Sequence, residues 1–220
     1  VGARGFLGEL SYSLGLFHTT NHDDILFQTT GRSTGLFANV DKTRRLGVES
    51  SLQGQWQNLK WMLAYSFVDA TFEADFQTLS PNHDFADDNG EIGVRRGDRI
   101  PGIPQNQFKL TAEYRVRDGL NIGLDIISNG GQFIRGDESN QLDEVDGYTV
   151  VTLRAHYRFN KQLEIFAKVD NLFDAEFETF GLLGEEPGEL DVPLIADMTI
   201  PVFLGAAPPR AGFVGIRYRF

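Results

Sequence analysis

Apolar and polar residues alternate along almost the whole chain of 220 residues. Successive side chains of a β-strand point to opposite faces, so a period of two predicts strands with one apolar face and one polar face. Eight stretches follow this pattern: 8–17, 47–56, 59–67, 106–116, 120–126, 151–159, 162–169 and 212–220. We therefore predict an all-β protein of about eight antiparallel strands in meander order.

The connections between these stretches are of two kinds. Three are tight: Gln57–Asn58, Arg117–Gly119 and Asn160–Lys161. The others are longer and polar: about 71–105, 134–147 and 181–211, with a shorter one near 29–41. Short periplasmic turns alternating with long extracellular loops are typical of a transmembrane β-barrel of the outer membrane. The pattern predicts a segment of such a barrel.

The polar face of the predicted strands carries charge. Arg154, His156 and Arg158 share one face, where a dry protein core would make their burial very costly. A water-filled barrel interior accepts such residues, and Trp56 and Trp61 beside a tight turn fit the aromatic girdle of a membrane barrel. The alternative is a soluble ligand-binding β-barrel, in which the aromatic face forms a single closed core.

Charge and composition exclude several other classes. The chain has 31 acidic and 20 basic residues and a net charge of -11, so we expect no nucleic-acid partner. It has no cysteine, which excludes disulfides and thiolate metal sites. No apolar run is long enough for a transmembrane helix. The start VGARGF has neither Met nor a signal peptide and indicates a mature form or an excised fragment.

Two short motifs suggest catalysis or metal binding, and neither has the context it needs. GRSTG at 31–35 fits G-x-S-x-G, but a nucleophile elbow needs a helix after it and here another strand follows. His22, Asp23 and Asp24 are better explained as polar residues at a strand end. We therefore expect no enzyme activity, no metal site and no cofactor.

The stretch DNLFDAEFE at 170–178 holds four acids: Asp170, Asp174, Glu176 and Glu178. If the strand before it continues, all four lie on the polar face, with Asn171 on the apolar face. Residues on one face are spaced roughly 6.7 Å apart, so the four cannot wrap one ion. The same parity places Phe159 opposite Leu163, and Arg158 opposite Glu164 as a lumen-facing ion pair.

Several stretches resemble a known family. GFVGIRYRF, with Val214, Ile216, Tyr218 and Phe220 alternating, is similar to the terminal signal read by the barrel-assembly machinery of the outer membrane. VDNLFDAEFETFG and PPRAGFVGIRYRF resemble the last hairpin of TonB-dependent outer-membrane receptors. NVDKTRRLGVESSLQ and RIPGIPQNQFKL resemble strands that follow surface loops in the same family.

This resemblance implies that residues 1–220 are the C-terminal portion of a barrel of twenty-two strands, in the outer membrane of a Gram-negative bacterium. The implied function is TonB-dependent uptake of a scarce ligand: a ferric siderophore or similar iron source, cobalamin or an oligosaccharide. The implied partners are outer-membrane lipid, lipopolysaccharide, a small-molecule ligand at the extracellular loops, and the TonB complex through an N-terminal region that this chain lacks. The alternative is an autonomous barrel of eight strands that serves as a pore, adhesin or anchor.

Three arginines stand out in the acidic loop 71–105. Arg95, Arg96 and Arg99 could hold an anionic ligand through bidentate contacts. Five acids lie close upstream of them, so pairing within the loop is the alternative. The three residues are nevertheless the predicted ligand contacts of the chain.

Overall fold

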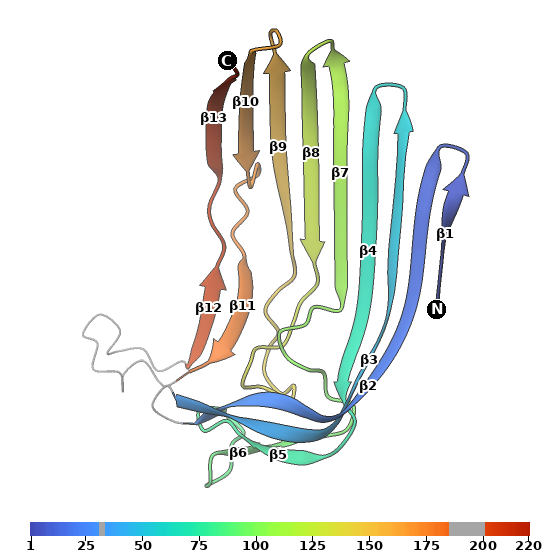
Figure 1. The fold of residues 1–220 in the computed structure, drawn as a ribbon. Helices are drawn as coiled ribbons and strands as arrows, with labels where there is room; N and C mark the ends of the chain where they lie inside the picture. The colour runs from blue at the N-terminus through green and yellow to red at the C-terminus, as the bar shows by residue number, and fades with distance from the viewer. Residues whose placement is uncertain (31–33, 185–200) are drawn as a thin grey trace, which may run out of the picture.

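Nine antiparallel strands form one open sheet in a computed structural model that describes residues 1–30, 34–184 and 201–220 (Figure 1). The spatial order is β1-β2-β3-β4-β7-β8-β9-β10-β13. Each neighbouring pair is antiparallel, as the predicted meander requires. Within the described ranges, no helix is long and apolar enough to cross a membrane.

Two short hairpins accompany the main sheet and form two-stranded sheets of their own. The strands of the main sheet are β1 (Gly2–Leu7), β2 (Leu10–Thr30), β3 (Thr34–Trp56), β4 (Leu59–Phe72), β7 (Asn106–Arg117), β8 (Leu120–Asn129), β9 (Tyr148–Arg158), β10 (Leu163–Asp170) and β13 (Ala211–Tyr218). The hairpins are β5 (Phe76–Leu79) with β6 (Glu91–Val94), and β11 (Glu178–Leu183) with β12 (Val202–Ala206).

The predicted tight turns are confirmed, and they lie at one end of the sheet, opposite the long loops (Figure 1). The turn between β7 and β8 requires glycine at position 119. Gly119 has φ +80°, a backbone conformation that side chains disfavour. A Cβ there would also lie 2.4 Å from the carbonyl oxygen of Arg158. Only glycine allows β9 to pass this close.

The strand register confirms an apolar face that runs across the sheet. One row of cross-strand neighbours from β3 to β13 consists of Trp56, Leu59, Tyr114, Ile122, Ala155, Ala167 and Val214. Trp56 and Val214 are 69% and 80% exposed. A continuous exposed apolar face of this size requires a non-aqueous environment or a partner, and lipid is the environment that the alternation predicted.

The sheet differs from the prediction at its N-terminal side. It has nine strands rather than about eight, because Gly2–Leu7 pairs with the start of β2 through a turn at Gly8 with φ +64°. Most of the predicted loop 29–41 is strand, since β3 begins at Thr34 and pairs with β2 up to Thr30. Residues 31–33, which include the serine of GRSTG, lie outside the described residues.

The strands β1 and β13 occupy the two edges of the sheet and are not paired with each other within the described residues. The sheet is therefore open. The structure gives no support to the alternative of eight strands that close into an autonomous barrel.

The long loops are structured and contain the main buried apolar clusters of the described residues. Loop 71–105 carries the hairpin β5–β6. The prediction of an unbroken loop over 181–211 is wrong, because β12 lies within this range and pairs with β11. The two buried clusters comprise Val40, Phe72 and Val94, and Ile134, Val145 and Leu183. Both lie at the loop end, so packing there holds the loops in place.

The predicted continuation of the strand through residues 170–178 is wrong. The strand β10 ends at Asp170, and Asn171 and Asp174 have φ of 50° and 55°. The amide of Asn171 closes the turn, because Oδ1 accepts the Ala175 N–H at 2.9 Å and Nδ2 donates to the Ala175 carbonyl at 2.9 Å. Asn171 is 4% exposed rather than lipid-facing.

The four acids of this stretch consequently do not share one strand face. Asp170 contacts Lys168 at 2.8 Å and accepts from Thr152 at 3.1 Å. Asp174 accepts the backbone N–H of Arg210 at 2.9 Å. The stretch is a turn that ties the end of β10 to the segment before β13.

Candidate functional site

A buried pair joins two loops at the loop end. Nε2 of His83 lies 2.9 Å from Oδ1 of Asp137, and both side chains have no exposed surface. Asp137 also accepts the backbone N–H groups of Gln141 and Leu142, each at 3.0 Å, and the Ser139 hydroxyl at 3.1 Å. Buried polar groups need such partners, so Asp137 organises its own loop and fixes the loop of His83 to it.

Hairpin β11–β12 joins the same assembly. The Leu183 N–H donates to the Arg135 carbonyl at 2.8 Å, and the Arg135 N–H donates to the Gly181 carbonyl at 3.0 Å. The Asn82 side chain donates to the Gly184 carbonyl. We call these three segments, 80–90, 130–147 and 178–184, the loop cluster. Backbone hydrogen bonds join 130–147 to 178–184, and side-chain hydrogen bonds join 80–90 to both, which gives the loop cluster a defined shape.

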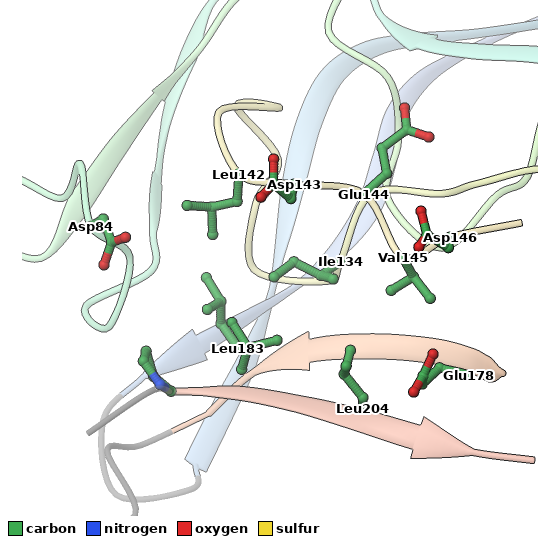
Figure 2. Close-up of a pocket in the computed structure, with 12 residues that line it drawn as sticks. Asp84, Ile134, Leu142, Asp143, Glu144, Val145, Asp146, Glu178, Leu183 and Leu204 are labelled. Atoms are coloured by element: carbon green, nitrogen blue, oxygen red, sulfur yellow. The ribbon is translucent and has the colours of Figure 1, made fainter. Parts of the chain in front are cut away.

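A cavity of about 440 Å³ lies within the loop cluster (Figure 2). Ile134 and Val145 line it from one loop, and Leu183 and Leu204 line it from the hairpin. Five carboxylates also line it: Asp84, Asp143, Glu144, Asp146 and Glu178. An apolar cavity with a carboxylate rim attracts ligands of positive or mixed charge. Among the described residues no group of three or more His, Asp or Glu is placed to hold a bare metal ion.

Glu138, next to Asp137, is also buried, with 5% of its surface exposed. Burial, and to a smaller extent the charge of Asp137, raises the pKa of this carboxyl to about 7, although the hydrogen bond from the Gly136 N–H lowers it. His83, Asp137 and Glu138 carried no sequence signal, because His83 and Asp137 are 54 positions apart and no motif links them. Only the packing of the loops brings them together.

The three predicted ligand arginines contact different partners. Arg99 pairs with Glu144 at 2.7 Å and lies over the Phe133 ring at 5.1 Å. Arg96 pairs with Glu73 at 3.2 Å. Arg95 lines a separate open groove with Phe85 and Gln141. Pairing within the loop therefore accounts for Arg96, and pairing with the neighbouring loop accounts for Arg99. Ligand binding by Arg95, Arg96 and Arg99 stays a prediction.

The remaining predicted residues lie at or near the strands. Arg158 and Glu164 are cross-strand neighbours, with Nε and Oε2 3.8 Å apart, and Arg217 contacts the same carboxylate at 3.2 Å. Val214, Ile216 and Tyr218 alternate on one face of β13, whose edge is unpaired within the described residues. Phe220 follows the strand and packs edge-to-face against Tyr218. Their roles in the lumen and in barrel assembly stay predictions.

His22, Asp23 and Asp24 mark a bend in β2. Asp23 has φ 53° and is skipped in the ladder to β3. Asp24 accepts from Thr43 at 2.5 Å and from Arg45 at 3.0 Å. These bonds hold the bend in a structural role, and Figure 1 shows the far ends of β2 and β3 turning across the loop end.

The structure has the features of the wall of an outer-membrane β-barrel. These are an exposed apolar face, tight turns at one end and packed loops at the other. The family model for the TonB dependent receptor-like β-barrel matches residues 1–172. The chain therefore belongs to the TonB-dependent receptor family, within the barrel part. Proteins of this family lie in the outer membrane of Gram-negative bacteria, and this is the location of the chain.

The similarity extends to named relatives. The metal-pseudopaline receptor CntO of Pseudomonas aeruginosa UCBPP-PA14 is 25% identical over 188 residues, which are 83% of this chain and 24% of that protein. The chain thus spans about a quarter of the length of the curated relatives it matches.

Solved structures show the same fold. The ferric yersiniabactin uptake receptor FyuA from Yersinia pestis has a TM-score of 0.71 at 18% identity, over 100% of this chain and 29% of that one. The siderophore receptor PiuA from Acinetobacter baumannii has a TM-score of 0.68 at 17% identity, over 97% of this chain and 26% of that one. The described residues beyond the family match, 173–184 and 201–220, therefore share the fold of these barrels.

Proposed function

We propose that residues 1–220 form the C-terminal portion of the barrel of a TonB-dependent receptor that takes up a scarce ligand as a metal chelate, most simply a ferric siderophore. The observation that carries this proposal is the family match over residues 1–172, in a chain whose loops enclose a carboxylate-rimmed cavity. Cobalamin and oligosaccharides are the other ligands that the resemblance implies.

The polar face of the sheet suits such a role without catalysis. Arg154 contacts Asp125 at 2.8 Å and Glu113 at 3.9 Å, and its neighbour in the register is Lys168. We propose that this charged face lines the lumen, where it passes a hydrated polar ligand. The TonB complex would act through a region of the full-length protein outside this chain, and the β13 edge would meet the barrel-assembly machinery.

The names of similar proteins support a metal chelate over the other ligands. Two curated relatives are named metal-pseudopaline receptors, and one similar structure is titled a copper transporter, OprC. The cavity in Figure 2 offers carboxylates to the cationic or amine groups of a chelate, and Arg95 offers a guanidinium to its anionic groups. We therefore extend the proposed ligands to chelates of metals other than iron.

Uptake of radioactive iron and zinc chelates tests the proposal in cells with and without the gene, each in TonB-proficient and TonB-deficient backgrounds. We expect uptake of one chelate to require both the gene and TonB. Replacing Arg95, Arg96 and Arg99 together by alanine should weaken uptake, while Arg117→Ala at the tight-turn end should leave it unchanged. Uptake that persists without the gene for every chelate tested would contradict the proposal.

A further inference from the structure

A second cavity, of about 420 Å³, lies between the bent ends of β2 and β3 and the loop 130–147. Its volume is in the range of small-molecule sites. Most of its lining is apolar, including Ile25, Ile103 and Leu182. Phe27 and Phe37 also line it and pack edge-to-face, with ring centroids 5.4 Å apart. Such walls accept an apolar or aromatic body.

Glu138 lines this cavity and is short of hydrogen-bond donors. A carboxylate can accept about four hydrogen bonds. Among the described residues Glu138 accepts two backbone donors, the Gly136 N–H to Oε1 at 3.2 Å and its own N–H. Asp137, beside it, accepts four. A carboxylate that is 5% exposed with so few donors is costly unless a ligand supplies more.

The charged groups around Glu138 leave room for a cation. Asp137 and His83 lie next to it, and they form their own closed pair. Arg135 lines the cavity but is exposed, and no ion pair between these two described residues joins it to Glu138. A ligand ammonium would therefore be the first full cation to meet the Glu138 carboxylate directly, and the aromatic walls would favour it further.

We propose that this cavity binds a small amphipathic amine, with its aromatic or apolar body between Phe27, Phe37 and Ile103 and its ammonium group hydrogen-bonded to Glu138. The proposal rests on the proposed function for placing these loops on the ligand side of the membrane. It goes beyond the proposed function by naming the chemical feature of the transported ligand that this cavity binds, a protonated amine beside an apolar body.

The pH dependence of binding follows from the carboxyl. With its pKa raised to about 7, Glu138 is mostly protonated at about pH 6 and mostly charged at about pH 8.5. Only the charged form pairs with an ammonium. We expect affinity for an amine to rise on the order of tenfold between these pH values.

The test is calorimetric titration of the full-length protein in detergent with 2-phenylethylamine, which stays cationic at both pH values. Glu138→Gln should lose affinity on the order of tenfold at about pH 8.5 and should also lose the pH dependence. Glu9→Gln is the matched control, since it removes an exposed carboxylate in the turn between β1 and β2, away from both cavities, and should keep both.

The proposal is overturned if Glu138→Gln binds the amine like wild type, or if 2-phenylethanol binds as tightly as the amine. A second variant, Ile25→Trp, fills the cavity from an exposed wall position and leaves Glu138 in place, so it should also weaken binding. Binding unchanged by Ile25→Trp would place the amine elsewhere and reject the site. The titration measures binding without transport, whereas the uptake assay measures transport. A failure of the amine site can therefore be told apart from a failure of the proposed function.

Discussion

Replacing Asp137 by alanine removes the acceptor that holds the loop cluster together. Oδ1 accepts from His83, Ser139 and Gln141, and Oδ2 accepts from Leu142. His83 and the backbone N–H groups of Gln141 and Leu142 lose their partner at a position with no exposed surface, while the Ser139 hydroxyl keeps a contact to Gln141 Oε1 at 3.2 Å. The substitution therefore tests whether the buried pair organises the loops.

The magnitude follows from these four bonds. Each buried donor left without a partner costs about 1–3 kcal/mol, and breaking a buried charged pair costs about 3–5 kcal/mol. Since water re-enters part of the site, we expect Asp137→Ala to destabilise the loop cluster by about 3–5 kcal/mol. Asp137→Asn can keep the three contacts at Oδ1 and turns its amide toward the Leu142 N–H, so it should cost about 1–2 kcal/mol.

Hydrogen exchange followed by mass spectrometry on the full-length protein in detergent measures this directly. A change of 1.4 kcal/mol is a factor of ten in the opening equilibrium. Peptides covering 80–90 and 132–145 should therefore exchange on the order of a hundredfold faster or more in Asp137→Ala. In Asp137→Asn the increase should be about tenfold, and peptides from β7 and β8 should not change.

The matched control is Asp143→Ala, an exposed acid of the same loop without a hydrogen bond to the described residues. It should leave exchange at the wild-type rate. If Asp137→Ala matches Asp143→Ala, the buried pair does not hold the loops. If asparagine is as harmful as alanine, the division of contacts between the two oxygens is wrong.

Three further predictions concern other parts of the fold. Because the pKa of Glu138 is raised on folding, the free energy of unfolding should fall as pH rises from about 4.5 to about 7, by on the order of 3 kcal/mol, and urea melts of Glu138→Gln should lack this decrease. Gly119→Ala should slow refolding and lower stability by about 2 kcal/mol, more than Gly97→Ala, whose φ is also positive but whose Cβ would meet no atom within 4 Å. Phe220→Ala should lower the amount of assembled protein in outer-membrane fractions several-fold, while Phe85→Ala should not.

The strands of the main sheet could largely be predicted from the sequence, because apolar and polar residues alternate along a strand whose two faces meet different surroundings. The parity around the turn at residues 160–162 also predicts Arg158 opposite Glu164, and the pairing of β9 with β10 confirms it. Register follows from alternation wherever a tight turn fixes which residues begin to pair.

The prediction from this alternation was wrong at residues 170–178, where the chain changes direction. Alternation continues through residues 170–178 although the strand ends, because the turn depends on the amide of Asn171 and on a positive φ rather than on polarity. The loop cluster could not be predicted either. The contact between His83 and Asp137 joins residues 54 positions apart, and it depends on how two long loops pack.

The central claim is that the sheet is a wall of an outer-membrane barrel with the loop cluster outside the cell. The chain has no cysteine, so single cysteines introduced at exposed sites report on each end separately. Asp143→Cys in the loop cluster and Lys161→Cys in the turn between β9 and β10 can be treated with a membrane-impermeant maleimide on intact cells. We predict that the loop site reacts in intact cells and that the turn site reacts only after the outer membrane is permeabilised. Equal reaction of both sites in intact cells, or the reverse order, would contradict the account.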